Sequence, residues 1–188
     1  MIIYYTHNFT GQKGESHRLL ELAIGKCLGD PAAAQSLCGS ITKTGNFGKP
    51  VIPSFSPFSI SHSGRTWAVL IADTDCGLDI QYYRPCNEKQ IADRFYAPED
   101  ARAANDEPAF FKIWARREAL IKALGGSVAE TDLPSVLSDK IVFAGRMWHM
   151  EDAVIPGTEK LAAALCAEDI EGAPDCEVIM QELDYRND

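Results

Sequence analysis

A strong helix signal in the middle of the chain is the feature that most constrains the fold. Asp106 is suited to cap the first turn, Pro108 is tolerated within that turn, and Gly125-Gly126 stops the helix. The apolar side chains between these signals recur with the 3.6-residue period of an amphipathic helix: Phe110, Ile113, Trp114, Leu120, Ile121 and Leu124. The sequence therefore predicts a long, capped helix with one buried face.

Strand patterns lie on both sides of this helix. Residues 1–5 are β-prone, residues 67–72 form a continuous apolar run of strand length, and residues 78–81 continue as another strand. Further strands are predicted in the last third of the chain: 140–143 running on towards Trp148, 161–167 and 177–183. Other helices are predicted before the long one: 16–28 with Ser16 as its N-cap and 29–31 as its end, 88–95, and a short one from Pro98. Residues 39–57 are predicted to form a long loop with short extended pieces. Strands and helices thus recur in two unequal blocks, which indicates an α+β fold.

Length and composition set the class of protein. A chain of 188 residues that is 46% hydrophobic fits one domain, or two small halves that share a core. No apolar run approaches the ~20 residues that span a bilayer. Residues 1–9 lack the basic and apolar regions of a signal peptide. We therefore expect a cytoplasmic protein with no membrane partner.

The charge is unevenly distributed along the chain. The net charge of −9 comes from the C-terminal third, since residues 127–188 carry 4 basic and 14 acidic groups. Residues 1–75 have a net charge of +1 and residues 76–126 are neutral, so these parts can hold a polyanionic ligand. Duplex nucleic acid requires a broad basic stripe, and no such stripe is visible. Nucleic-acid binding is therefore not expected.

The cysteines give no regular metal or disulfide pattern. They are Cys27, Cys38, Cys76, Cys86, Cys166 and Cys176, and no two have C-x-x-C spacing. The four histidines form no H-x-x-x-H pair. Reduced thiols, mostly buried, are the better interpretation for a chain without a secretory signal.

An aspartate within the segment 77–81 is the first candidate for chemistry. Alternate side chains of a strand share a face, so Leu78 and Ile80 would pack inward while Asp79 and Gln81 point together the other way. A carboxylate on an otherwise apolar strand must be paired or must bind a metal. The alternative is an aspartate that caps a turn.

Glu118 and Lys122 form the second candidate constellation. Together with Trp114 they stand at i, i+4 and i+8 along the long helix and make one stripe beside its apolar face. A carboxylate next to a lysine near a core can hold a divalent cation and a phosphate together. The alternative is an ordinary surface pair worth about 0.3–0.5 kcal/mol.

The third candidate constellation is formed by residues 58–64, Phe-Ser-Ile-Ser-His-Ser-Gly. Neighbouring Ser61 and His62 are not a hydrolase triad, and no G-x-S-x-G elbow is present. Consecutive hydroxyls, an imidazole and turn amides suit a phosphate instead. Upstream, Gly48-Lys49-Pro50 fails the Walker pattern, which disfavours a P-loop nucleotidase.

The order and spacing of these motifs are more specific than any one of them. G-K-P at 48–50, F-S-I-S-H-S-G at 58–64, G-L-D-I at 77–80 and F-x-x-x-W-x-x-R-E-A-x-x-K at 110–122 resemble the Sfp-type 4'-phosphopantetheinyl transferase family. The resemblance extends back to His17-Arg18 and forward through 177–183, so it covers nearly the whole chain.

The resemblance implies a fold and a reaction. The fold would be two similar α+β halves, 1–75 and 76–188, related by a pseudo-twofold axis, with the active site in the cleft between them. The C-terminal half would carry the metal-binding motifs. The enzyme would transfer the 4'-phosphopantetheine arm of coenzyme A to a serine of an apo acyl or peptidyl carrier protein and release adenosine 3',5'-bisphosphate. We expect a monomer.

The resemblance also implies roles for single residues. Asp79 and Glu118 would hold Mg²⁺, or Mn²⁺, on the pyrophosphate, and Glu118 would help to deprotonate the incoming serine. Lys122 would offset charge on the pyrophosphate and its leaving oxygen. The ligand contacts are implied at five positions: Arg18, Ser61 and His62 at the 3'-phosphate, with Lys49 and Pro50 flanking the adenine.

Two positions depart from the family pattern. Gln81 replaces the second acidic residue of D-x-E, so its contact to the metal would be neutral and could run through water. Arg117 replaces the lysine before the glutamate. Two alternatives therefore stay open: a weakened module that only binds coenzyme A or a carrier, and a different metal-dependent phosphotransferase or hydrolase. The sequence does not select the carrier protein or its pathway.

Overall fold

The computed structural model describes residues 1–44, 48–126, 132–170 and 177–185. Within them lie five helices: α1 (Glu15–Leu28), α2 (Pro31–Cys38), α3 (Glu88–Phe95), α4 (Pro98–Ala103) and α5 (Glu107–Leu124). The strands of the first half are β1 (Ile2–Thr6), β2 (Thr42–Thr44), β3 (Lys49–Val51), β4 (Phe58–Ser63) and β5 (Thr66–Ile71). The remaining strands are β6 (Cys76–Tyr82), β7 (Lys140–Phe143), β8 (Arg146–Ala153), β9 (Leu161–Glu168) and β10 (Ile179–Glu182). The chain is thus a mixed α+β structure, as predicted.

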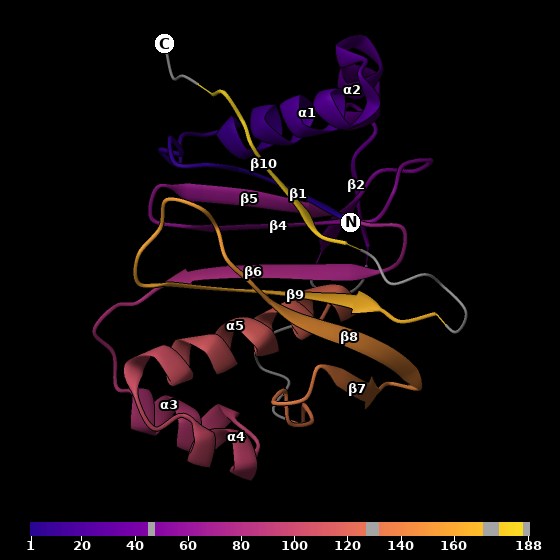
Figure 1. The fold of residues 1–188 in the computed structure, drawn as a ribbon. Coiled ribbons are helices and arrows are strands. Elements are labelled where there is room, and N and C mark those ends of the chain that lie inside the picture. The colour runs from indigo at the N-terminus through magenta and orange to yellow at the C-terminus, as the bar shows by residue number, and fades with distance from the viewer. Residues whose placement is uncertain (45–47, 127–131, 171–176, 186–188) are drawn as a thin grey trace.

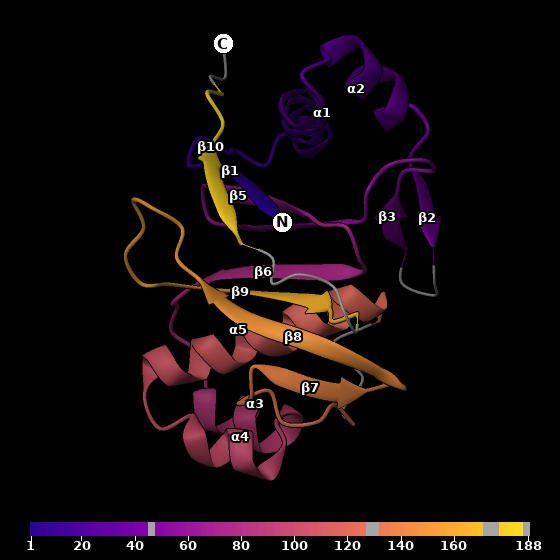
Figure 2. The ribbon, with the colours of Figure 1, turned by 45° about the vertical axis from the view of Figure 1, so that its right-hand side comes forward.

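Two four-stranded sheets form the centre of the molecule. The first has the strand order β10-β1-β5-β4 and the second the order β6-β9-β8-β7, while β2 and β3 form a separate hairpin. The sheets lie one above the other, with α1 and α2 on the outer side of the first and α5, α3 and α4 on the outer side of the second (Figures 1 and 2). The edge strands β4 and β6 run side by side where the two sheets meet.

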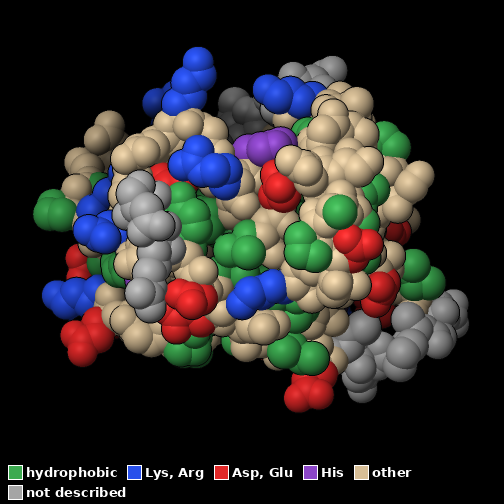
Figure 3. Space-filling model, turned by 90° about the horizontal axis from the view of Figure 1, so that it is seen from above, with side chains coloured by type: hydrophobic (Ala, Val, Ile, Leu, Met, Phe, Trp, Pro, Cys, Tyr) green, Lys and Arg blue, Asp and Glu red, His purple; other side chains and the backbone are tan. Residues whose placement is uncertain are grey.

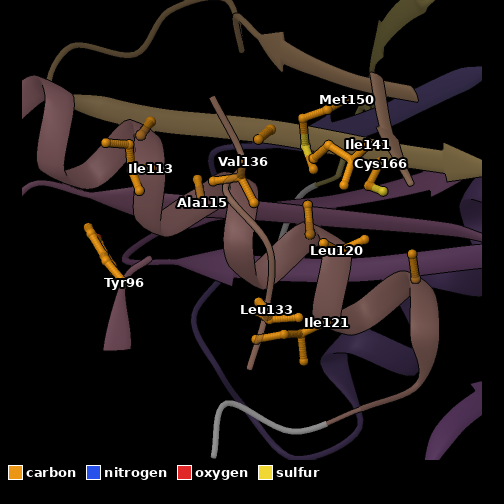
Figure 4. Close-up of a cluster of buried hydrophobic side chains, with 14 of the residues drawn as sticks. Tyr96, Ile113, Ala115, Leu120, Ile121, Leu133, Val136, Ile141, Met150 and Cys166 are labelled. Atoms are coloured by element: carbon orange, nitrogen blue, oxygen red, sulfur yellow. The ribbon is translucent and has the colours of Figure 1, made fainter. Parts of the chain in front are cut away.

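Three clusters of buried side chains hold these layers together. Ile3 and Leu70 of the first sheet pack against Leu78 and Leu165 of the second. The opposite face of the first sheet packs against α1 through Trp67, Val69, Leu19 and Ile24. The opposite face of the second sheet packs against α5, with Leu120, Ile113, Ile141 and Met150 in one continuous cluster (Figure 4). This packing explains the apolar period of α5, since its inward positions meet a sheet.

The structure corrects two sequence predictions and adds a helix. Ser16 does not cap α1; the N-cap is Gly14, which has a φ of 82°. The predicted stop at 29–31 ends α1, and residues 31–38, for which the sequence yields no prediction, form α2, with the Asp30 side chain accepting from the amides of Ala32 and Ala33. The segment from 140 towards Trp148 is not one strand but the hairpin β7–β8.

The last strand returns to the first sheet. β10 pairs in parallel with β1, with Ile2 opposite Ile179. Residues 177–183 therefore contribute to the sheet of the N-terminal segment, although they belong to the C-terminal third of the sequence. In the described ranges, no helix is both long and apolar enough to cross a bilayer.

The described cysteines are free thiols: Cys27, Cys38, Cys76, Cys86 and Cys166. Cys38, Cys76 and Cys166 are buried, whereas Cys27 and Cys86 are exposed. Burial raises the pKa of Cys76 and of Cys166 to about 12, which keeps both thiols protonated at neutral pH. Cys176 lies outside the described residues.

On the face formed by α1 and α2, Lys and Arg side chains lie among acidic and hydrophobic ones (Figure 3). The described part of this face has no continuous basic stripe.

Candidate functional site

The site is built where α5 crosses β6. Asp79 lies on β6 with its side chain towards the helix, and Lys122 reaches it from the last turn of α5. The Lys122 ammonium donates to Asp79 Oδ1 at 2.7 Å, to Ser61 Oγ at 3.0 Å and to the carbonyl oxygen of Leu78 at 3.1 Å. The Ser61 hydroxyl donates to the same Asp79 oxygen at 3.0 Å. A strand, a helix and the neighbouring sheet therefore meet at one carboxylate.

One oxygen of this carboxylate has no partner. Asp79 is only 6% exposed, and among the described residues nothing hydrogen-bonds to its buried Oδ2. Burial raises the pKa of Asp79, while the Lys122 charge and the Ser61 hydroxyl act in the opposite direction. An unpaired buried polar atom destabilises the folded protein. A cation bound to Oδ2 would remove this penalty.

Glu118 lies one turn before Lys122 on α5. Its pKa is raised to about 7, first because it is buried and then because the charge of Asp79 is near, while Lys122 and Arg117 partly offset the shift. A cation placed between two carboxylates offsets the repulsion between their negative charges.

The two carboxylates fit a magnesium ion. No group of three or more His, Cys, Asp or Glu side chains gathers in the part of the chain that the structure describes. Mg²⁺ does not need such a cage, since it is usually held by one or two carboxylates, substrate phosphates and retained waters. Asp79, with its unpartnered oxygen, and Glu118 supply that number.

Gln81 shares the face of Asp79 on β6. Its side chain is half-buried, and its amide nitrogen donates to the carbonyl oxygen of Tyr82 at 3.3 Å. The amide nitrogen is thus engaged, and the side-chain carbonyl oxygen is the atom of Gln81 with the chemistry of a cation ligand, at the position where the family pattern has a carboxylate.

A cavity lies next to Lys122. It has a volume of about 210 Å³ and is lined by residues of the G-K-P motif, of β4 and of the end of α5: Gly48, Lys49, Pro50, Phe58, Ser59, Ile60, Lys122, Gly125 and Gly126. An adjoining cavity of about 270 Å³ shares Lys49, Phe58 and Gly125. The predicted adenine residues Lys49 and Pro50 thus lie beside the predicted phosphate residue Lys122.

The Lys49 ammonium is also a structural link. It donates to the carbonyl oxygens of Cys76 on β6, at 3.0 Å, and of Ala123 on α5, at 3.1 Å. A cation at the carboxyl end of a helix binds carbonyls that have no partner within the helix. Lys49 therefore fixes the β2–β3 hairpin against both elements that carry the site.

The structure separates the side chains of Ser61 and His62. As neighbours on β4 they point to opposite faces: Ser61 towards Asp79, and His62 outward, where its ring lies 5.0 Å from the ring of Phe9. His62 and Arg18 are both exposed. In the ligand-free structure the Ser61 hydroxyl is thus engaged at the carboxylate site, and a joint contact of Ser61 and His62 with the 3'-phosphate stays a prediction.

Arg117 points away from the carboxylates. Its guanidinium lies 3.5 Å from a buried Asp100 oxygen and 5.4 Å from the centre of the Tyr96 ring, and it donates to the carbonyl oxygen of Phe95. Arg117 therefore holds α5 to the α3–α4 segment. The sequence pattern identifies it only as a neighbour of Glu118.

Part of this chain is similar to known proteins of one superfamily. Residues 75–149 match the family model of the 4'-phosphopantetheinyl transferase superfamily. The 4'-phosphopantetheinyl transferase AcpT of Salmonella typhi is 37% identical over 109 residues, which cover 50% of this chain and 57% of that protein. The 4'-phosphopantetheinyl transferase psf-1 of Bacillus pumilus is 36% identical over 98 residues, 47% of this chain and 41% of that protein.

A third relative carries the same description. The 4'-phosphopantetheinyl transferase HetI of a Nostoc species is 31% identical over 98 residues, 45% of this chain and 41% of that protein. The matched region spans about half the length of these curated relatives. Over the segment that contains Asp79, Glu118 and Lys122, the chain resembles the 4'-phosphopantetheinyl transferase superfamily.

Proposed function

We propose that this protein transfers the 4'-phosphopantetheine arm of coenzyme A to a serine of an apo acyl or peptidyl carrier protein. The observation that carries the proposal is the gathering of Asp79, Glu118 and Lys122 beside the cavity lined by Lys49 and Pro50. The match of residues 75–149 to a family of such transferases supports the same reaction.

The reaction needs charge neutralisation more than covalent help. A bond forms between the serine oxygen and the phosphorus that bears the pantetheine, and the pyrophosphate bond breaks to give adenosine 3',5'-bisphosphate. Asp79 and Glu118 would hold Mg²⁺, or Mn²⁺, which when bound neutralises charge on the phosphate oxygens. Gln81 would contact this ion through its carbonyl oxygen, directly or through water.

The protein side chains would move the proton and stabilise the leaving group. Glu118 would help to accept the proton of the carrier serine, directly or through a water. Lys122, already 2.7 Å from Asp79, would offset negative charge on the pyrophosphate and its leaving oxygen. Lys49 and Pro50 would flank the adenine, while Arg18 and His62 would bind the 3'-phosphate.

The wider setting follows from the same proposal. We place the enzyme in the cytoplasm, acting as a monomer. Residues 1–75 and 76–188 would form two halves with the active site in the cleft between them, with β10 as the strand that the second half returns to the first.

Mass spectrometry tests the reaction directly. The protein is incubated with coenzyme A, Mg²⁺ and apo carrier proteins from fatty acid, polyketide and peptide synthases, and each carrier is weighed. We expect at least one carrier to gain one phosphopantetheine, and none to do so without the metal. Binding of coenzyme A with no gain in mass would indicate a weakened binding module. Phosphate release from nucleotides with unmodified carriers would indicate another phosphotransferase.

A further inference from the structure

Three serines of β4 form a regular row of hydrogen bonds with β6. The side-chain oxygens of Ser59, Ser61 and Ser63 accept from the backbone amides of Leu78, Ile80 and Tyr82, at 2.9, 3.1 and 2.9 Å in that order. Each bond joins residues 19 positions apart, so the register is constant. We call Ser59, Ser61 and Ser63 the serine row.

The serine row provides hydrogen-bond acceptors for backbone amides at the edge of the second sheet. Among the described strands, β6 pairs with β9 alone in its sheet. At every second residue, the amides on the other edge of β6 have no backbone partner in the described part of that sheet. Buried amides must be paired, and alternate side chains of β4 reach them in step because both strands have a period of two. Side-chain oxygens thus join two sheets whose strands do not pair through their backbones.

Ser61 differs from the other members of the row. It is 4% exposed, and besides accepting from Ile80 its hydroxyl donates to Asp79 Oδ1 at 3.0 Å and accepts from the Lys122 ammonium at 3.0 Å. A hydroxyl has one proton and two lone pairs, so all its bonding capacity is used. The β6 backbone, the carboxylate and the ammonium therefore share one oxygen.

We propose that Ser61 is a positioning residue that fixes Asp79 Oδ1 and the Lys122 ammonium relative to the β6 backbone. With Oδ1 held by Ser61 and Lys122, the other oxygen of Asp79 stays available for a ligand. The inference rests on the proposed function for its kinetic part only, because the coupling between Ser61 and Asp79 is a property of the protein without any ligand.

Unfolding of the ligand-free protein tests the coupling. The variants are Ser61→Ala, Asp79→Asn and their combination, with Ser63→Ala in the parallel cycle, since Ser63 makes the same type of amide bond but is not bonded to Asp79 or Lys122. A hydrogen bond to a charged group predicts a coupling of roughly tenfold or more in the unfolding equilibrium constant for Ser61 with Asp79. The Ser63 cycle should be additive within about twofold. Additivity in both cycles would overturn the inference.

Transfer kinetics test the consequence at the site. Ser61→Ala should lower kcat roughly tenfold while the KM for coenzyme A changes less than about twofold, because the hydroxyl has no capacity left for the ligand. Ser61→Thr, which keeps the hydroxyl, should restore most of kcat, and Ser63→Ala should match the wild type. A rise in KM at unchanged kcat would overturn the positioning role.

The two parts separate the inference from the proposed function. If the wild type modifies no carrier but the Ser61 cycle is coupled, the proposed function fails and the positioning of Asp79 stands. If carriers are modified but the Ser61 cycle is additive, the inference fails alone. Should Ser61→Ala not fold, Ser61→Cys replaces it in both measurements, since a thiol is a much weaker partner.

Discussion

Gly77 on β6 lies directly against the backbone of Ala119 on α5. A Cβ at residue 77 would lie 1.9 Å from the Ala119 carbonyl oxygen and 2.6 Å from the amide nitrogen of Ala123. Only a residue without a side chain permits this approach. Glu118 immediately precedes Ala119, and Lys122 follows one turn later, so the contact also brings both towards Asp79.

Gly77→Ala should therefore destabilise the protein strongly. Neither colliding group is a flexible side chain, so α5 must move from the sheet, at a cost of about 3 kcal/mol or more. Urea unfolding followed by circular dichroism measures the loss. Gly39→Ala is the matched control, because Gly39 has a φ of −63° and a Cβ there would approach its neighbours no closer than 3.4 Å. Equal midpoints for the two variants would contradict the packing described here.

Glu118→Gln should abolish carrier modification while the fold is kept. The substitution removes a carboxylate from the metal site, and the base of the proposed mechanism, at nearly constant volume. Mass analysis of the carrier measures the loss, and circular dichroism checks the fold. Wild-type turnover in this variant would refute the role given to Glu118.

The same substitution should change how stability depends on pH in the metal-free protein. The folded pKa of Glu118, about 7, lies above its ordinary value of 4.5. The contribution of this group is therefore fully present below pH 4.5 and is lost as pH rises through 7. Relative to wild type, Glu118→Gln should gain up to about 3 kcal/mol between these limits. Parallel stability curves for the two proteins would exclude a raised pKa.

Lys122→Ala should lower turnover more than coenzyme A affinity, because its charge is needed most in the transition state. It should also destabilise the ligand-free protein by about 3 kcal/mol, since it leaves the buried Asp79 charge without its partner. The double variant Asp79→Asn, Lys122→Met should recover much of that stability, because no buried charge remains. A pure KM effect would make Lys122 a binding residue only.

His62→Ala should weaken coenzyme A far more than 3'-dephospho-coenzyme A. The proposed contact to the 3'-phosphate is charge-assisted and worth about 1.5–3 kcal/mol, and the dephospho ligand has nothing for it to hold. Calorimetric titration of both ligands gives the comparison. Loss of the ring contact with Phe9 would weaken both ligands alike, so equal losses would refute the assignment.

Gln81→Glu should lower the magnesium concentration needed for half-maximal rate. The side chain shares the strand face of Asp79, and a carboxylate binds a hard cation more strongly than a neutral amide does. Gln81→Ala should be mild, because Asp79 and Glu118 already supply the charge. A magnesium titration at fixed coenzyme A and carrier compares the three proteins. An unchanged magnesium dependence in Gln81→Glu, with Asp79→Asn inactive, would show that position 81 does not reach the metal.

Local chemistry explains which elements could be predicted from the sequence. The limits of α5 follow from Asp106, whose side chain accepts from the Ala109 amide, and from Gly125, which has a φ of 69°. Ser16 misled the prediction because its hydroxyl accepts from the Trp67 indole at 2.8 Å, a contact from another element. The pairing of β10 with β1 has no local signal at all.

The functional site, too, could be predicted from the sequence only in part. Helical spacing brought Glu118 and Lys122 together, and the resemblance connected them to Asp79. Sequence adjacency suggested that Ser61 and His62 act together, but strand alternation separates them. The signal for the serine row was present as the two-residue period of Ser59, Ser61 and Ser63; that its partner is the edge of β6 depends on the tertiary fold.

The parallel pairing of β1 with β10 also has a consequence for biosynthesis. Ile2 leaves the ribosome before Ile179, its partner, which follows 177 positions later. Until then the outer edge of β1 is open to strands of other nascent chains. This edge therefore closes only after residues 179–182 have been made, so their loss would promote aggregation even though they lie far from Asp79 in the sequence.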